Sequence, residues 1–318
     1  MSQPTLLHEK AQIDSKTKSS NVLEGFTKSQ EEKEEDGEQG SEFAKLPQEC
    51  VLHVLSFTTP RDSCRSAVVS KAFLSGASSD ALWERFIPSD YAEILSRAVH
   101  PVEFSSSKKE LYFGLCKPIL IDGGKLERKA SSELPISLQC QSFHLERSTG
   151  GKCYMVPSSS LWMAWGNVWR HWRWISHSDS RFGEVAELVF VCWLEITGSI
   201  NSGLLSKKTW YTAYIVFKLA SGAYGLNSPP QKVSISLGAY SSDRFITLQQ
   251  DDDDEEEEEE DEKGKRKLRD DGWMEIELSD FYNDEGDKGE ASIRLSQCEA
   301  LHFKHGLLIE GLEFRPKI

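Results

Sequence analysis

The stretch Glu184-Val-Ala-Glu-Leu-Val-Phe-Val-Cys-Trp-Leu-Glu-Ile196 alternates along its whole length. One face carries an unbroken apolar row from Ala186 to Ile196, and the other mixes valine and glutamate with Trp193. A period of two is the signature of a β-strand that buries one face. We therefore predict one strand over 184–196, buried on one side and partly covered on the other.

More strands are predicted towards the C-terminus. Residues 209–219 are rich in β-branched and aromatic side chains, which favour strands. Similar runs bounded by Gly, Ser, Asn or Pro are Lys232–Leu237, Gly272–Leu278, Ala291–Leu295 and Leu307–Phe314. Because no amphipathic helices separate these runs, we predict an antiparallel, jelly-roll-like β-sandwich over 119–318.

Residues 43–88 have a helical pattern instead. Pro47 suits the first position of a helix, where its missing N–H costs nothing, and residues from Val51 to Leu55 give that helix an apolar face. Short helices continue to Phe86. A unit this small buries little apolar surface, so we expect it to gain stability from a partner helix. The chain is thus a multidomain α+β protein, with a partly helical linker over 89–118.

The charge of the chain is unevenly distributed. The net charge is −14, but residues 251–262 are twelve consecutive acids, and five bases follow within 263–269. We expect a solvated loop over 251–269 and a disordered acidic and polar tail over 1–42. The remaining body is nearly neutral, which argues against a nucleic-acid partner. The basic run Lys263–Arg269 fits a nuclear localisation signal or simple charge balance, and both interpretations stay open.

Neither a membrane role nor an extracellular one is expected from the sequence. The seven cysteines include no C-x-x-C pair, the first residues do not resemble a signal peptide, and no apolar stretch approaches the length of a membrane span. We expect free thiols and a soluble protein of the cytoplasm, the nucleus or both.

Signals for catalysis are weak. There is no G-x-S-x-G motif, and Gly150-Gly151-Lys152 lacks the other residues of a phosphate-binding loop. His302 and His305 lack two further ligands at zinc spacing. We therefore expect no catalytic residue, no metal site and no cofactor.

Tryptophan is concentrated in one segment. Five of the nine tryptophans fall within thirteen residues: Trp162, Trp165, Trp169, Trp172 and Trp174. Such a cluster suggests flat platforms on which a base, a cation or a sugar can stack, although a core corner with scattered surface rings is the alternative. Three other tryptophans lie within predicted strands and are expected in the core or on a sheet face: Trp193, Trp210 and Trp273.

The helical region resembles an F-box. The resemblance rests on Leu46-Pro-Gln-Glu-Cys-Val-Leu-His-Val-Leu-Ser56, followed by Val68–Phe73 and by Leu82-Trp83. It implies docking onto the Skp-type adaptor of cullin-RING ubiquitin ligases. By position, the residues that would form the docking surface or its support are Leu46, Pro47, Val51, Leu55, Val69 and Trp83.

The β-region resembles the plant phloem lectin family, also called phloem protein two or Nictaba-like. The matching stretches include Gly151–Met155, Arg181–Leu188, Thr209–Leu219, Gly272–Leu278 and Gly311–Pro316. This resemblance implies a β-sandwich that binds N-acetylglucosamine oligomers or N-glycans. The sugar-contacting tryptophans of the family fall on Trp165 and Trp172.

An F-box followed by such a domain is similar to the plant F-box subgroup of that family. The resemblance implies a non-catalytic substrate receptor of a Skp–cullin–F-box ubiquitin ligase, with the Skp-type adaptor, cullin and N-glycoproteins as partners. Two alternatives stay open. The chain could be a lectin or interaction module that does not direct ubiquitination, or its β-domain could bind protein or a small molecule.

Overall fold

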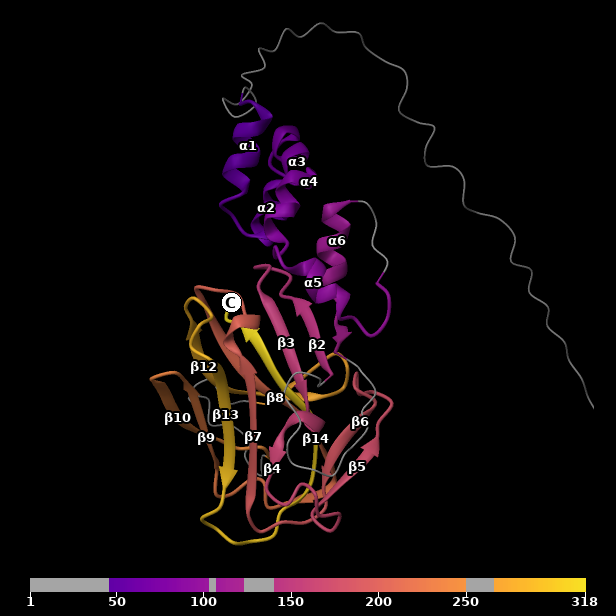
Figure 1. Ribbon diagram of the computed structural model, residues 1–318, viewed down its shortest axis with the longest axis vertical. Helices are drawn as coiled ribbons and strands as arrows, with labels where there is room; N and C mark the ends of the chain where they lie inside the picture. Colours follow the sequence, from indigo (N-terminus) through magenta and orange to yellow (C-terminus); the bar gives the residue numbers. More distant parts are fainter. Residues whose placement is uncertain (1–45, 103–106, 123–139, 250–265) are drawn as a thin grey trace, which may run out of the picture. The chain divides into compact units, whose positions relative to one another are not determined.

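The computed structural model describes residues 46–102, 107–122, 140–249 and 266–318 (Figure 1). The tail expected over 1–42 and the acidic run 251–262 lie outside the described residues. None of the helices in the described ranges is long and apolar enough to cross a membrane.

The N-terminal part of the described chain is helical. Its helices are α1 (Gln48–Leu55), α2 (Pro60–Ser66), α3 (Lys71–Ala77), α4 (Asp80–Phe86), α5 (Tyr91–Ser96) and α6 (Lys108–Leu115). Hydroxyl caps start several of them: Thr59 accepts from the N–H of Asp62, and Ser70 accepts from that of Phe73. Pro47 directly precedes α1 and is not its first residue, one position from the prediction.

Helices α1 to α4 form a small helical module around an aliphatic core. Val51 and Leu55 of α1 pack with Ala77 and Leu82. Gly76 permits the close approach of α3 to α1, because a Cβ there would lie 3.1 Å from side-chain atoms of Val51 and Leu55. Of the apolar face predicted for the first helix, Val51 and Leu55 pack inward, whereas Val54 is half exposed.

The segment 89–118, expected to be a partly helical linker, contains α5 and α6. Tyr112 of α6 is fully buried, and its ring lies 5.1 Å from that of Trp83 between centroids. The Tyr112 hydroxyl donates to the carbonyl oxygens of Glu146 and Arg147. Because Trp83, Tyr112 and residues of the β-strands belong to one hydrophobic cluster, this segment packs as part of the core.

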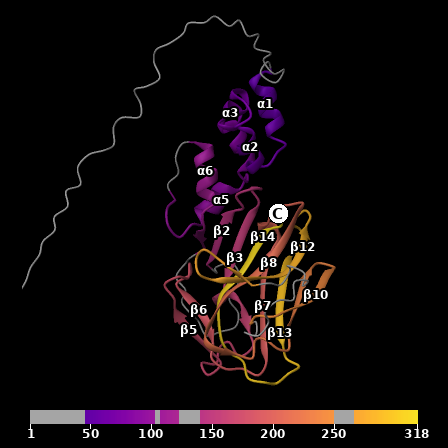
Figure 2. The same cartoon turned by 180° about the vertical axis from the view of Figure 1, so that it is seen from behind.

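The described residues from 119 onward form two antiparallel sheets. The nine-stranded sheet contains β1 (Ile119–Ile121), β2 (Gln141–Leu145), β3 (Lys152–Pro157), β14 (His305–Pro316), β8 (Thr209–Tyr224), β12 (Met274–Asn283) and β11 (Lys267–Leu268) in that order. In the same sheet, β6 (Glu184–Leu188) also pairs with β14, and β5 (Trp172–Ser176) pairs with β6. The five-stranded sheet contains β10 (Tyr240–Ile246), β9 (Gln231–Leu237), β13 (Glu290–Gln297), β7 (Leu194–Asn201) and β4 (Trp162–Met163). In both views β5 and β6 lie on the opposite side of the sandwich from β9 and β10 (Figures 1 and 2).

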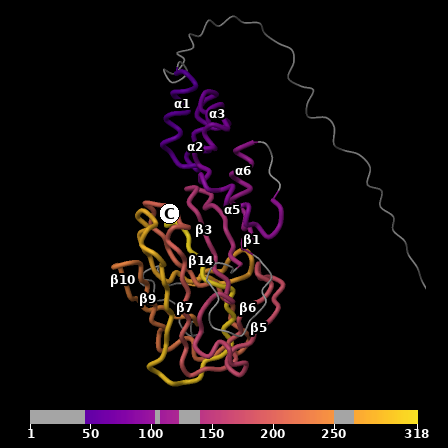
Figure 3. Tube along the Cα trace, in the orientation of Figure 1, coloured from indigo at the N-terminus to yellow at the C-terminus, as the bar shows by residue number. Residues whose placement is uncertain are grey.

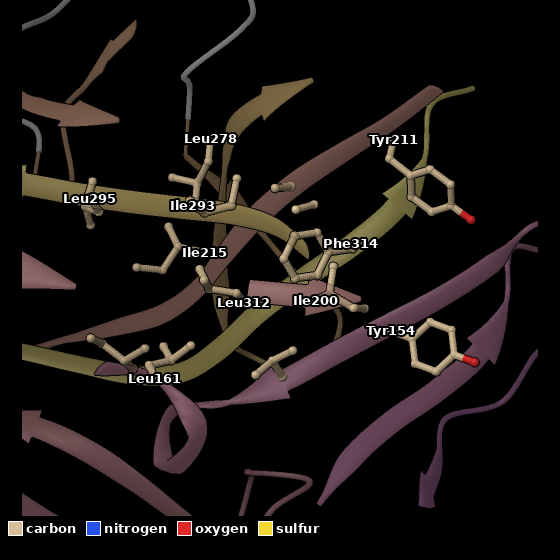
Figure 4. Close-up of a cluster of buried hydrophobic side chains, with 14 of the residues drawn as sticks. Tyr154, Leu161, Ile200, Tyr211, Ile215, Leu278, Ile293, Leu295, Leu312 and Phe314 are labelled. Atoms are coloured by element: carbon tan, nitrogen blue, oxygen red, sulfur yellow. The ribbon is translucent and has the colours of Figure 1, made fainter. Parts of the chain in front are cut away.

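The core lies between these two sheets. Figure 4 shows Ile215 of β8 and Phe314 of β14 close to Ile293 of β13 and Ile200 of β7. All four side chains are buried to 2 % exposure or less, as tightly packed sandwich cores require. The predicted antiparallel sandwich behind a small helical region is confirmed, although neither sheet closes into a barrel.

The single strand predicted over 184–196 is wrong. β6 ends at Leu188 and belongs to the nine-stranded sheet, whereas β7 begins at Leu194 in the five-stranded sheet. The chain therefore crosses between the sheets in this interval, and Figure 3 shows β6 and β7 in different parts of the sandwich. The apolar row is continuous because inward residues of both strands face the same core from opposite sides. The other predicted strands appear as β8, β9, β12, β13 and β14.

A buried charge cluster stabilises the outer side of the nine-stranded sheet. The Glu313 carboxylate is 2.6 Å from Arg269 and also pairs with Arg181 and Arg315. Burial opposes ionisation of Glu313, but the three guanidinium groups outweigh it and lower its pKa to about 2. Arg269 also pairs with Glu275. Arg269, the last residue of the possible localisation signal, is therefore held by carboxylates and does not belong to a solvated basic run.

Candidate functional site

The helical module exposes far more apolar surface than its size requires. Five of its apolar side chains are exposed, and we call them the exposed apolar set: Val54, Phe57, Val68, Val69 and Leu74. Val54 is on α1 and Phe57 follows it, Val68 and Val69 lie in the turn between α2 and α3, and Leu74 is on α3. Val68 is 88 % exposed, Phe57 77 % and Val69 70 %. Val68 and Val69 are adjacent in the chain, so the turn between α2 and α3 presents two neighbouring apolar side chains to a partner.

The predicted adaptor-binding residues divide into two groups. Leu46, Pro47 and Val69 are exposed, so they can contact a partner. The other three are at most 1 % exposed, so of the two expected roles only support of the surface is open to them: Val51, Leu55 and Trp83.

Helix packing decides between these two roles. Helical spacing identifies an apolar face, but in a small module most of that face is used for the internal core. The Trp83 indole, for example, donates a 2.8 Å hydrogen bond to the Ala77 carbonyl. Sequence reasoning did not assign Val54, Phe57, Val68 and Leu74 to the docking surface. The signal that could have found them is an excess of apolar residues over what four short helices can bury.

A second surface, on the β-domain, is made of aromatic rings. The aromatic platform, as we call it, consists of Trp165, His171, Phe190 and Phe303. Ring centroids are 6.0 Å apart for Trp165 and His171, 6.3 Å for His171 and Phe190, and 4.6 Å for Phe190 and Phe303. Trp165, Phe190 and Phe303 are between 40 % and 58 % exposed. A row of exposed rings in mutual contact can receive the apolar face of a ligand ring.

Trp165 reaches the surface through a strained turn. Its φ is +62°, a left-handed conformation that costs a residue with a Cβ roughly 1–2 kcal/mol. The turn is closed by the N–H of Gly166, which donates to Met163 O, and by the N–H of Val168, which donates to Trp165 O. Strain of this kind concentrates at functional positions, where the surrounding structure maintains it.

His171 is fixed between the other rings. Its Nδ1 lies 2.6 Å from the carbonyl oxygen of Phe190, and its own carbonyl accepts from the N–H of Val189. The imidazole therefore links the tryptophan-rich loop to the segment that connects β6 and β7.

Lys304 fixes the other half of the platform. Its side chain is fully buried, and its ammonium group donates to the carbonyl oxygens of Cys192, Ala300 and His302 at 2.7, 3.2 and 3.1 Å. Its backbone also pairs with that of Val191. A buried ammonium group is costly unless its donors are satisfied, so these contacts bind the two segments tightly together. The rings of Phe190 and Phe303 are thereby held side by side.

Trp172, predicted to contact sugar, requires a correction. It is 2 % exposed, and its indole N–H donates to the carbonyl oxygen of Ala164 at 3.0 Å. The ring belongs to the hydrophobic core and offers no face to a ligand. It supports the loop that presents Trp165, the other predicted contact, which is exposed.

The remaining tryptophans also depart in part from expectation. Trp273 is fully buried, as predicted for a strand residue. Trp210 is 50 % exposed on β8, so it lies on a sheet face, one of its two expected placements. Trp193 is 48 % exposed and precedes β7, so its expected placement within a strand is wrong. Alternation along a strand separates two faces but does not say which of them a second layer covers. Within the described ranges, no group of three or more His, Cys, Asp or Glu could hold a metal ion.

Family models match the two parts of the chain that carry these surfaces: Phloem protein 2 over residues 151–316 and F-box-like over 43–89. The Arabidopsis thaliana proteins "F-box protein At2g02240" and "Putative F-box protein PP2-B2" are 42 % and 40 % identical, and the alignments cover 87 % and 86 % of this chain and 81 % and 83 % of theirs. "F-box protein PP2-B10" of the same plant is 38 % identical, over 87 % of this chain and 95 % of its own.

The similarity to solved structures is weak. A TmCBM61 structure in complex with beta-1,4-galactotriose matches with a TM-score of 0.28 and 9 % identity, over 51 % of this chain and 91 % of that one. At such a score the similarity carries no argument about ligand or fold.

Proposed function

Because the chain belongs to the phloem protein 2 family and carries an F-box-like domain, we propose that it is the substrate receptor of a Skp–cullin–F-box ubiquitin ligase. The helical module docks on the Skp-type adaptor, and the β-domain recognises glycans or glycoproteins that contain N-acetylglucosamine. The observation that carries the ligase role is the exposed apolar set on a module that family comparison matches to F-box-like.

The docking step depends on burial of apolar surface. Each fully buried valine or phenylalanine side chain contributes roughly 1.5–3 kcal/mol when it leaves water. Phe57, Val68 and Val69 are mostly exposed, so a partner helix that covers them gains several such contributions. The chain supplies no catalytic residue in this proposal. The recruited enzymes transfer ubiquitin, in the cytoplasm, the nucleus or both.

Adaptor binding is tested with the double variant Val68→Glu, Val69→Glu. Both positions are highly exposed, so the substitutions leave the fold intact while placing two charges in the docking surface. Co-purification of the full chain with Skp-type adaptor and cullin should be lost. Leu268→Glu is the matched control, because Leu268 is 72 % exposed on β11, outside the module, and should leave co-purification unchanged. Retention of the adaptor by the double variant would refute the docking proposal.

Glycan recognition is assigned to the aromatic platform. The Trp165 indole offers a half-exposed face, and the adjacent His171 ring supplies a polar edge. A sugar ring has an apolar face that stacks on indole and hydroxyl groups that hydrogen-bond around it. The platform also explains why the chain maintains a strained backbone at Trp165.

A glycan array on the full chain tests this assignment. Binding to glycans that contain N-acetylglucosamine should disappear in Trp165→Ala and persist in Trp162→Ala, a matched control because both tryptophans are 58 % exposed. No binding by the folded wild-type chain would mean that the platform reads protein or a small molecule.

A non-ligase role is separated from the proposed one in cells. If the chain directs ubiquitination, proteasome inhibition should raise the level of the glycoproteins that it captures. Unchanged levels would favour an interaction module whose F-box serves another complex.

A further inference from the structure

A cleft far from the aromatic platform opens where β8 and β12 of one sheet meet β10 of the other. Its volume is about 490 Å³, within the usual range of small-ligand sites. Eight residues line it: Trp210, Tyr240, Ser242, Arg244, Glu277, Ser279, Asp280 and Lys317. Strand β14 begins just after Phe303 of the platform and ends just before Lys317 of the cleft. Its 12 residues span roughly 40 Å, so the two sites are separate.

Trp210 forms one wall of the cleft. It is half exposed, whereas its neighbour Tyr211 is fully buried, because adjacent strand residues point to opposite faces. Its ring lies 5.4 Å from that of Tyr282, the residue paired with it on β12. Its backbone carbonyl accepts from the N–H of Lys317 at 2.8 Å. The indole is thus braced by a second ring and by the C-terminal residues, and it still faces the cleft.

The polar groups of the cleft are held in place before any ligand arrives. Asp280 pairs with Lys317 and accepts a 2.6 Å hydrogen bond from the Thr212 hydroxyl. The Tyr240 hydroxyl donates to the backbone carbonyl of Asp280 at 3.2 Å. A ligand that enters the cleft therefore meets side chains that are already ordered, and binding loses little of their conformational entropy.

The charges in the cleft balance. Arg244 pairs with Glu277 at 3.4 Å, and Lys317 pairs with Asp280. An anionic or cationic ligand would have to compete with a partner already in place. A neutral ligand gains from both pairs, because carboxylates accept hydrogen bonds from hydroxyl groups and the cations donate to them.

These features together select one ligand class. The exposed indole can receive a flat apolar face, and the paired charges and the hydroxyls of Ser242 and Ser279 can hydrogen-bond to a ligand with many hydroxyl groups. The balance of charge favours a ligand that is neutral. We propose that this cleft binds a ring of a neutral saccharide, with its apolar face on Trp210. The inference does not depend on the platform, since the cleft shares no residue with it.

The test uses the full chain labelled with 5-fluorotryptophan and observed by fluorine NMR. Trp210→Phe and Trp165→Phe assign the two signals among the nine tryptophans. The probes are neutral trisaccharides of N-acetylglucosamine, glucose, xylose, mannose and galactose, compared with an oligogalacturonate and a trimethyl-lysine peptide. At least one neutral sugar should shift the Trp210 signal, and that shift should persist in Trp165→Phe.

Two variants measure the affinity of the cleft by calorimetry. Trp210→Ala should weaken binding by about tenfold or more, since it removes the stacking face. Ser242→Phe fills the cleft and leaves Trp210 in place, so it should abolish the ligand-induced shift of the Trp210 signal. This variant serves as the test if Trp210→Ala does not fold.

The outcomes separate this inference from the proposed function. A response at Trp165 with none at Trp210 across all neutral sugars overturns the cleft and leaves the platform standing. A response at Trp210 with none at Trp165 supports the cleft and removes the glycan role of the platform. Binding at Trp210 of only the galacturonate or only the methylated peptide overturns the neutral-saccharide class.

Discussion

The helical module and the aromatic platform both expose apolar side chains, but they hold them in different ways. The exposed apolar set of the module stands over an aliphatic core that includes Val51 and Leu55. The platform is fixed by directional contacts instead: three carbonyls on the Lys304 ammonium, the contact of His171 with Phe190 O, and the buried Trp172 beneath the loop. Its rings also touch one another.

This difference is consistent with the partners that we propose for the two surfaces. Apolar burial is nondirectional, so a surface that receives a helix tolerates adjustment of its side chains on binding. Stacking depends on ring orientation, and a loosely held ring would lose affinity to conformational entropy. The polar anchors of the platform are therefore as much part of the site as the rings.

The largest expected effect tests the core beneath the exposed apolar set. Leu55→Ala removes a side chain that is 1 % exposed, and it should lower the free energy of unfolding by about 3 kcal/mol. Val54→Ala, one residue away and half exposed, should change it by no more than about 0.5 kcal/mol. Val54→Ala should nevertheless weaken adaptor binding. Urea unfolding measures the stability of each variant, and titration with the adaptor measures its binding. Equal stability losses in the two variants would remove the distinction between core and surface.

An intermediate effect is expected at the anchor of the platform. Lys304→Met leaves three carbonyls without their donor and should cost about 2 kcal/mol of unfolding free energy. Glycan affinity should fall as well, because the rings of Phe190 and Phe303 are no longer held together. Lys208→Met, at an exposed lysine, is the control and should change neither quantity. Unchanged glycan affinity in a destabilised Lys304→Met chain would show that the rings do not need the anchor.

The smallest effect concerns the backbone of the platform. Trp165→Gly should be more stable than Trp165→Ala by about 1 kcal/mol, because glycine adopts a φ of +62° without strain. At Trp169, in the same loop but without a positive φ, the order should reverse, with alanine more stable than glycine. Thermal or urea unfolding of the four variants decides this, and the same order at both positions would contradict strain at Trp165.

The sequence predicted the architecture better than the site. β8, β9, β12, β13 and β14 fall where periodicity and turn residues place them, because alternation is a local property that survives folding. The strand over 184–196 failed for the same reason. A period of two continues unchanged while the chain passes from one sheet to the other, so nothing local marks the crossing.

Predictions of individual site residues were only partly successful. Trp165 and Val69 are on the surface as expected, whereas Trp172 is buried beneath it. The sequence around Phe303 contains no pattern that assigns this residue to the platform. Phe303 is 113 residues from Phe190 in the chain, and the two rings meet where Lys304 holds their segments together.

By itself, the sequence determined that a small helical module precedes an antiparallel sandwich, and that one segment of the sandwich region is unusually rich in tryptophan. The tertiary structure alone decided which faces are covered. It buried Trp172 and exposed Trp210, and it assembled the platform from segments distant in the chain. The physical reason is that strand and helix periods depend on neighbouring residues, whereas solvent exposure depends on what another part of the chain packs against each face.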